Sequence, residues 1–297
     1  MRSFLRPIKE CLSPAWRTRI RKVLARVPLA RRLAHVQIEP WQVGLVVGGT
    51  MKGGTTALSA FLDQHPEIRM AHGKEAHFFD TDEHFRPGCQ TDYGLYHRHF
   101  SPGPCTRLLG DATPIYLYWE PAPARVAAYN PRMKWVLLLR QPAERAYSHW
   151  NMLRLNGTES LAFDEAVQRR GAGILPAELQ AGKMPAPRPA QCRIFAYLDR
   201  GFYARQLRRL FAVVPRQQVL VLRSEELRRD HHATLRRIFE FLGIDAGVRI
   251  EPAVIHPGKY DAHLPAGLKR ELTSHFIDDI RDLEHLLGWD LSDWLTV

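Results

Sequence analysis

The feature that most limits how this chain can fold is a glycine-rich segment at residues 48–56 (GGTMKGGTT). A short, continuous apolar run at residues 43–47 comes before it and is typical of a buried strand. Residues 55–62 follow, and their apolar side chains fall on one face of a predicted helix. An opening unit of strand, glycine-rich loop and helix predicts an α/β fold.

Strand and helix patterns continue to alternate along the rest of the chain. Strands are expected at residues 135–139 and 219–222, and helices at 142–155, 203–214, 234–242 and 268–287, the last one closed by Gly288. This alternation predicts a single P-loop-like α/β domain over residues 41–297, with a central, mostly parallel sheet flanked by helices. Residues 171–190 are rich in Gly, Ala and Pro and are expected to form a mobile loop over an acceptor site.

Residues 1–40 form a separate, strongly basic segment. Ten lysines and arginines and only two glutamates give residues 1–39 a net charge of +8 out of the chain's +11. Apolar residues recur among them at helical spacing, which predicts an amphipathic N-terminal arm. The arm is interpreted either as an ordinary helix with a solvated basic face or as a contact for an anionic membrane surface.

Cysteine spacing and hydropathy argue against a zinc protein, a membrane-spanning protein and a secreted protein. The cysteines are Cys11, Cys89, Cys105 and Cys192, and none forms a CxxC pair or a spacing typical of zinc sites. Free thiols are expected, with a Cys89–Cys105 disulfide as the alternative. The chain has no apolar run long enough to span a bilayer and no signal-peptide core. We therefore expect a cytoplasmic protein, soluble or peripheral at the inner membrane surface.

The glycine-rich segment has the composition of an anion site. Glycines allow the backbone to approach a phosphate closely, and the N-terminus of the following helix directs N–H groups at it. Lys52 adds a positive charge, and the hydroxyls of Thr55 and Thr56 add donors. The segment differs from the nucleoside-triphosphatase loop, in which the lysine follows the last glycine, because Lys52 precedes Gly53 and Gly54.

A second candidate phosphate ligand is Arg140, which follows the strand predicted at residues 135–139. Open α/β sheets bind ligands at the carboxyl ends of their strands, and a guanidinium matches a phosphate bidentately. An isolated arginine in such a position is more often a surface ion pair. The glycine-rich segment 90 residues upstream favours the phosphate interpretation instead.

Two motifs in this chain resemble those of the sulfotransferases that use 3′-phosphoadenosine 5′-phosphosulfate (PAPS). Residues 48–56 are similar to their 5′-phosphosulfate loop, and residues 139–150 (LRQPAERAYSHW) are similar to their 3′-phosphate motif. The KGGT form resembles the branch with heparan sulfate sulfotransferases and bacterial carbohydrate sulfotransferases. Supporting matches lie at residues 62–68 (LDQHPEI), 74–79 (KEAHFF), 110–117 (GDATPIYL), 201–207 (GFYARQL) and 287–290 (LGWD).

The resemblance implies a role for each matching residue. Lys52, Gly53, Gly54, Thr55 and Thr56 would bind the 5′-phosphosulfate, and Arg140 and Ser148 the 3′-phosphate. Lys259, in a loosely matching loop before the last helix, is a further 3′-phosphate candidate, with an ordinary loop lysine as the alternative.

The matched glutamate, Glu75, would be the general base, with His77 as its orienter or as a second proton acceptor. If residues 74–77 are extended, Glu75 and His77 share a face. The alternatives are structural ion pairs of Glu75 with Lys52 or Lys74, and a satisfied buried histidine at His77. The implied reaction is in-line transfer of a sulfuryl group from PAPS to a hydroxyl of a saccharide or glycosylated acceptor, without a metal. An amine is the less favoured acceptor group. Ala112 departs from the lysine of several heparan sulfate enzymes, so the acceptor is expected to differ.

Three other functions remain open from the residues themselves. A Mg²⁺-dependent P-loop nucleotide kinase would share the strand, loop and helix, although the position of Lys52 opposes it. A catalytically inactive nucleotide-binding adaptor would need a decayed site, whereas Lys52, Glu75, Arg140 and Ser148 are all present. Nucleic-acid binding by the basic arm has charge in its favour but no recognised module.

Overall fold

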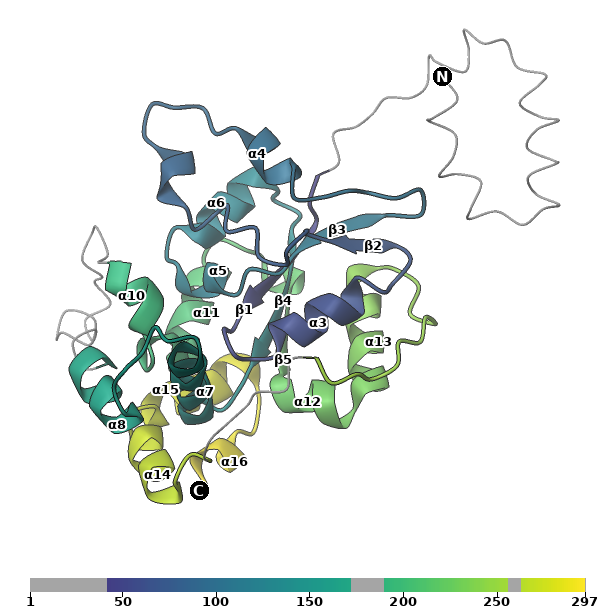
Figure 1. Cartoon of the computed structure of the whole chain (residues 1–297). Helices are drawn as coiled ribbons and strands as arrows, with labels where there is room; N and C mark the ends of the chain where they lie inside the picture. The colour runs from purple at the N-terminus through teal and green to yellow at the C-terminus, as the bar shows by residue number, and fades with distance from the viewer. Residues whose placement is uncertain (1–41, 172–189, 256–262, 297) are drawn as a thin grey trace, which may run out of the picture.

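The computed structural model describes residues 42–171, 190–255 and 263–296 (Figure 1). The predicted N-terminal arm at residues 1–40 and Lys259 lie outside the described residues, as does all but the two ends of the loop predicted at residues 171–190.

The described residues contain a five-stranded sheet in the order β2-β3-β1-β4-β5. Its strands are β1 (Leu45–Gly49), β2 (Ile68–Met70), β3 (Leu108–Asp111), β4 (Lys134–Leu139) and β5 (Val219–Arg223). All four strand pairings are parallel, which confirms the predicted α/β class and the parallel sheet. The strand expected at residues 43–47 begins two residues later, and β2 and β3 were not predicted because they are too short to show a pattern.

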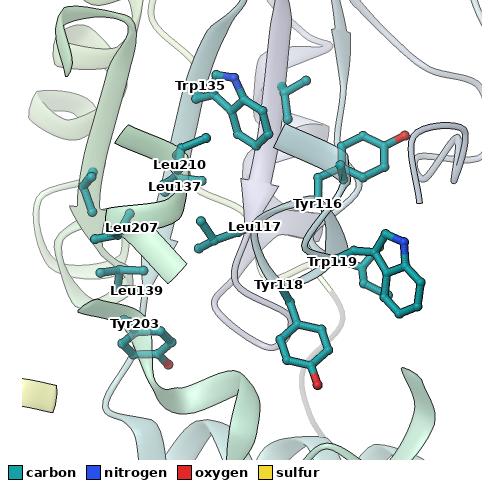
Figure 2. Close-up of a cluster of buried hydrophobic side chains, with 14 of the residues drawn as sticks. Tyr116, Leu117, Tyr118, Trp119, Trp135, Leu137, Leu139, Tyr203, Leu207 and Leu210 are labelled. Atoms are coloured by element: carbon teal, nitrogen blue, oxygen red, sulfur yellow. The ribbon is translucent and has the colours of Figure 1, made fainter. Parts of the chain in front are cut away.

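Helices cover both faces of this sheet, as predicted (Figure 1). One face carries α3 (Thr55–Leu62), α12 (Ser224–Arg229) and α13 (His231–Leu242), and the other carries α5 (Ile115–Tyr118), α6 (Ala122–Tyr129), α7 (Pro142–Leu155), α11 (Tyr203–Phe211) and α15 (Ile277–Leu287). Successive β4 residues alternate between the two cores, so Leu137 packs in one and Leu138 in the other. Figure 2 shows the core that contains Leu137, where side chains of β4 and α11 meet.

Shorter elements complete the described chain. They are the helices α4 (Tyr93–His97), α8 (Phe163–Ala166), α10 (Ala190–Phe195), α14 (Ala266–Ser274) and α16 (Ser292–Leu295), the 3₁₀ turns η2 (Asp82–Phe85), η5 (Asp199–Gly201) and η6 (Arg216–Gln218), and the π turn η3 (Val167–Gly171). The predicted helix at residues 203–214 ends earlier, at Phe211, and the one predicted from residue 234 begins at His231. Cys89 and Cys105 are exposed and are not joined by a disulfide, so the disulfide alternative is wrong for this structure.

The single helix predicted at residues 268–287 is wrong. The chain forms α14 and α15 instead, because the backbone leaves the helix at Phe276 (φ −108°, ψ −2°). The break buries the Phe276 ring completely, against Gly201, where a Cβ atom would lie 2.7 Å from the ring. Gly288 does end α15 with a positive φ of 67°, as predicted.

Asp279 of α15 is half-buried and caps another helix. Its carboxylate accepts hydrogen bonds from the backbone N–H groups of Ala204 (3.0 Å) and Arg205 (3.4 Å), at the start of α11. Asp282, one turn further, does face solvent and pairs with Arg208 at 2.7 Å. Within the three described ranges, no helix is both long enough and apolar enough to cross a bilayer.

Candidate active site

The predicted site residues within the described ranges lie on segments at the carboxyl edge of the sheet. The glycine-rich loop leaves β1, the segment with Glu75 and His77 leaves β2, and Arg140 follows β4. Because the strands are parallel, these carboxyl ends lie at one edge. The Glu75 segment is also tied to β3, since Ala71 N–H donates to Gly110 O at 2.8 Å. Only Lys259, outside the described ranges, is not placed by this topology.

The loop after β1 packs directly against β4. Thr50 donates both its N–H (2.8 Å) and its hydroxyl (3.0 Å) to Leu138 O. Gly53 is buried so closely that a Cβ atom would lie 2.6 Å from Leu138 O and 2.7 Å from Thr50 Oγ1. Gly54 begins α3 with a φ of 97° and provides no side-chain cap, so the helix N-terminus keeps donors for an anion. This tight backbone cradle fits a phosphate or sulfate group.

Lys52, Thr55 and Thr56 surround this cradle. Lys52 is half-buried in the left-handed backbone region (φ 69°), Thr55 is buried and Thr56 is half-buried. Burial lowers the pKa of nearby His149 well below its ordinary value, and the charges of Arg200, Arg145 and Lys52 add to this effect. The loop therefore lies beside a neutral buried histidine of α7 and in a positive electrostatic environment.

Arg140 lies where β4 passes into α7. Its backbone oxygen accepts a hydrogen bond from Tyr203 Oη at 2.8 Å, which fixes the main chain. Its guanidinium makes only a long contact with Glu144 (3.4 Å), and its buried Nε has no hydrogen-bond partner in the described chain. Glu144 is also paired with Lys269 at 3.1 Å. A weakly held, partly buried guanidinium of this kind suits an anionic ligand.

The second predicted 3′-phosphate ligand, Ser148, lies on α7, eight residues after Arg140. Its side chain is buried. Lys269 of α14 was not predicted, because nothing in the local sequence marks it, although it brings a further positive charge to Glu144 beside Arg140.

Glu75 and His77 are in contact, although the predicted reason is wrong. The segment is not extended, because Lys74 (φ 76°) and His77 (φ 51°) both have left-handed backbone conformations. These turns bring His77 Nε2 to 3.2 Å from Glu75 Oε2, and Lys74 Nζ contacts the other carboxylate oxygen. The structural ion pair with Lys74 and the contact with His77 therefore coexist on the same carboxylate.

These contacts set the charges at the site. Burial opposes ionisation of Glu75, but the hydrogen bond from His77 and the charge of Lys74 outweigh it and lower the pKa of Glu75. A hydrogen bond to Asp80, followed by the one to Glu75, raises the pKa of His77 to about 9. At neutral pH Glu75 is therefore a carboxylate able to accept a proton, and His77 is an imidazolium.

Sequence reasoning missed the groups that hold His77. Asp80 is fully buried and lies 3.1 Å from His77 Nδ1. Its three-residue spacing from His77 was the available signal. Asp80 is in turn paired with Arg193 of α10, for which no local signal exists because 113 residues separate the two.

Sequence reasoning also did not predict the structural role of a buried carboxylate that packs against the Glu75 segment. Asp111, at the end of β3, accepts hydrogen bonds from the hydroxyls of Thr113 (2.6 Å), Tyr116 (2.8 Å) and Tyr96 (3.1 Å). Burial raises the pKa of Asp111, and these hydrogen bonds oppose that rise. In the ranges that the structure covers, no group of His, Cys, Asp and Glu side chains could hold a metal ion.

Comparison with known proteins gives a consistent family. The sequence matches the family described as "Sulfotransferase domain" over residues 44–256. It is 30% identical over 202 residues to mouse (Mus musculus) heparan sulfate glucosamine 3-O-sulfotransferase 3B1, covering 67% of this chain and 45% of that protein. It is also 30% identical over 203 residues to the bovine (Bos taurus) bifunctional heparan sulfate N-deacetylase/N-sulfotransferase 2, covering 67% of this chain and 22% of that protein. The chain thus spans less than half the length of these curated relatives.

A solved structure agrees with this assignment. The sulfotransferase from Alicyclobacillus acidocaldarius superposes with a TM-score of 0.68 at 28% identity, over 86% of this chain and 99% of that one. That similarity covers most of this chain. Because the family match covers well over half of its residues, the chain belongs to the sulfotransferase family.

Proposed function

We propose that this chain transfers a sulfuryl group from PAPS to a hydroxyl of a saccharide or a glycosylated compound. The observation that carries the proposal is the placement of three features on one edge of the sheet. These are the backbone cradle after β1, the loosely held guanidinium after β4 and the ionised Glu75 after β2. A nucleotide with phosphates at both ends of its ribose needs two separate anion sites, and β1 and β4 are adjacent strands.

In this proposal the donor lies across β1 and β4. The N–H groups at the start of α3, with Thr55 and Thr56, bind the 5′-phosphosulfate, and Lys52 neutralises charge on the leaving phosphate oxygen. Arg140 and Ser148 bind the 3′-phosphate. The tight approach at Gly53 and the buried, unpartnered Nε of Arg140 support this assignment. For Lys259 the 3′-phosphate role remains a prediction from the sequence.

The acceptor approaches from the Glu75 side. Its hydroxyl oxygen forms a bond to sulfur while the bond from sulfur to the nucleotide phosphate oxygen breaks, and the hydroxyl proton moves to Glu75. The lowered pKa keeps Glu75 ionised before the reaction, and His77, which is already protonated, orients that carboxylate. The resulting nucleotide is 3′-phosphoadenosine 5′-phosphate (PAP).

The names of the relatives support a saccharide as acceptor, since they act on heparan sulfate or its glucosamine. Ala112, the residue directly after β3, is fully buried and brings no charge to the acceptor side, so an acceptor different from heparan sulfate fits this chain. Contact of the N-terminal arm with a membrane, and a cytoplasmic location, remain predictions from the sequence.

Calorimetric titration with PAP in the absence of Mg²⁺ tests the donor site. Wild-type protein should bind PAP tightly and 5′-AMP much more weakly, and Arg140→Ala should weaken PAP binding by about 10- to 100-fold through loss of a charged hydrogen bond. The matched control is Arg223→Ala, because Arg223 ends the neighbouring strand β5 but is paired with Asp293. Equal affinity for PAP and AMP would overturn the proposal.

Glu75→Gln tests the base. An amide cannot accept the hydroxyl proton, so kcat for PAP release with an acceptor found in a saccharide panel should fall about 10²- to 10⁴-fold. PAP affinity should stay within about twofold of wild type. Glu240→Gln, which changes an exposed glutamate paired with Arg236, provides the control. Unchanged kcat in Glu75→Gln would remove Glu75 from the reaction.

A further inference from the structure

Arg193 of α10 is bound to the Glu75 segment by several contacts. Its Nη1 donates to Asp80 O at 2.6 Å, and its Nη2 contacts the Asp80 carboxylate. Its guanidinium stacks over the Trp119 ring, 4.5 Å from the centroid. Its own backbone oxygen accepts a hydrogen bond from Arg200 Nη2 at 2.6 Å. Arg193 is therefore held from both sides and presents two donors to a single residue.

These contacts extend a chain of alternating charges up to the candidate base. Arg193 pairs with Asp80, Asp80 with His77 Nδ1 at 3.1 Å, and His77 Nε2 with Glu75 at 3.2 Å. Lys74 ends the chain on the other oxygen of Glu75. The order is cation, anion, cation, anion, cation, so each carboxylate lies between two positive groups.

Without Arg193, Asp80 would be the least well paired member of this row of charged side chains. Its side chain is fully buried, and a buried carboxylate is stable only with full pairing and hydrogen bonding. His77 Nδ1 lies 3.3 and 3.1 Å from the two oxygens of Asp80, but it has a single proton to share between them and the ring is about half exposed. The two-point contact from Arg193 fixes both the carboxylate and the backbone carbonyl of Asp80.

We propose that Arg193 is a positioning residue for the base, acting through Asp80 to hold the His77 ring against Glu75. Asp80 with its orientation fixed by Arg193 keeps the Nδ1 proton of His77, and this directs Nε2–H at the Glu75 carboxylate. The second oxygen of Glu75 is held by Lys74. This inference rests on the proposed role of Glu75, and it adds a residue from a different part of the chain to the acceptor side of the site.

The hydrogen bond to Asp80 is the largest contribution that raises the pKa of His77, so this pKa reports the contact directly. Among the described residues, the contacts place Glu75 and Arg193 against the His77–Asp80 pair, with Lys74 on the other oxygen of Glu75, and the titratable Tyr116 also lies near Asp80. If Asp80 loses its fixed orientation, His77 loses that contribution, and its pKa should fall toward the ordinary value of about 6.5.

The experiment is an NMR titration of the histidine ring nitrogens in ¹⁵N-labelled full-length protein, with His77 assigned from a His77→Gln variant. In wild type, His77 should titrate near 9. In Arg193→Met the pKa of His77 should fall by about one unit or more, and in Arg193→Lys, which keeps the charge, it should fall less. Asp80→Asn removes the carboxylate itself, so it should lower the pKa of His77 at least as much as Arg193→Met does, and Arg193→Lys covers the case in which Arg193→Met does not fold.

Arg125→Met is the matched control. Arg125 anchors the same segment by the same kinds of contact, donating to Phe79 O at 2.9 Å, pairing with Asp82 at 2.8 Å and stacking on Phe85 at 4.4 Å. It does not contact Asp80, so its loss should leave the pKa of His77 unchanged. Equal falls in both methionine variants would mean general loosening of the segment and would overturn the proposal.

An unchanged or raised pKa of His77 in Arg193→Met would also overturn it. Calorimetry with PAP on the same variants separates this inference from the proposed function. PAP affinity should stay within about twofold of wild type in every Arg193 variant, because these residues lie on the acceptor side. Failure of wild-type protein to bind PAP would remove the proposed function, whereas the His77 titration would still decide whether Arg193 positions the ring.

Discussion

Gly53 leaves no room for a side chain at the centre of the anion cradle. A Cβ atom there would lie 2.6 Å from Leu138 O and 2.7 Å from Thr50 Oγ1, which real structures essentially never show. The loop would have to move away from β4, and the N–H groups at the start of α3 would move with it. The charge of Lys52 can therefore contribute to anion binding only while the loop stays packed against β4.

Gly53→Ala should consequently reduce both stability and donor binding. Displacing the loop should lower the free energy of unfolding by about 1–3 kcal/mol and weaken PAP binding at least about tenfold. Gly267→Ala in α14 is the control, because a Cβ atom added there would meet nothing within 4 Å and alanine favours a helix. Urea denaturation and calorimetry measure the two effects, and normal PAP affinity in Gly53→Ala would contradict the assigned cradle.

The raised pKa of His77 makes stability depend on pH. The folded protein binds the His77 proton more tightly than the unfolded chain does, so this contribution is fully present below about pH 6.5 and is lost as pH rises through about 9. Because the His77 side chain is 49% exposed, solvent screening reduces the effect to about 1 kcal/mol. Urea unfolding at pH 6.5 and pH 9 should show this loss in wild type and a smaller one in His77→Gln.

At the scale of elements, α11 receives its N-terminal cap from another helix. Its own N-cap residue, Phe202, makes no side-chain cap, and Asp279 of α15 accepts from the N–H groups of Ala204 and Arg205 instead. The α11 helix also carries Tyr203, whose hydroxyl fixes the backbone of Arg140. The contact between α11 and α15 thus supports the end of β4, where the 3′-phosphate is proposed to bind.

Asp279→Ala should therefore destabilise the protein by about 1–2 kcal/mol at pH 7.5, as the loss of a helix cap does. Burial raises the pKa of Asp279 to about 6, so the carboxylate is ionised at that pH. Asp282→Ala, which removes only an exposed pair with Arg208, should cost less than about 0.5 kcal/mol. Equal losses in urea denaturation would show that Asp279 acts as an ordinary surface residue.

At the scale of the whole molecule, the parallel sheet gathers loops from distant parts of the sequence at one edge. β1 and β4 are adjacent although 84 residues separate the end of one from the start of the other. A ligand that contacts both loops must bind the folded state alone, since the unfolded chain does not bring them together. Donor binding and global stability are therefore coupled.

PAP at a hundredfold excess over its dissociation constant should raise the free energy of unfolding by about 2.7 kcal/mol. The same concentration of 5′-AMP should add far less, and Arg140→Ala should lose most of the PAP effect, because the 3′-phosphate then has no bidentate partner. Urea denaturation with and without each nucleotide measures this. Equal stabilisation by PAP and 5′-AMP would show that the 3′-phosphate is not bound.

Local sequence was enough to predict the elements whose signals are local. The helix at residues 142–155 has the predicted bounds because Pro142 suits a first turn, and α3 begins directly after its glycines. Positive φ at Gly288 ends α15 as predicted, and Gly243 ends α13 in the same way. The motifs also predicted that Glu75 and His77 are partners. The two side chains are in contact, although the segment between them is not extended.

Only the tertiary structure decided the contacts between residues that are distant in sequence. The pairing of Asp80 with Arg193, the cap that Asp279 provides to α11, and the break at Phe276 each depend on what packs against the residue in space. Periodicity records which face of an element is apolar but not which element covers it. Strand, loop and helix were therefore determined by the sequence of each segment, whereas the support of the candidate base was determined by packing across the sheet edge.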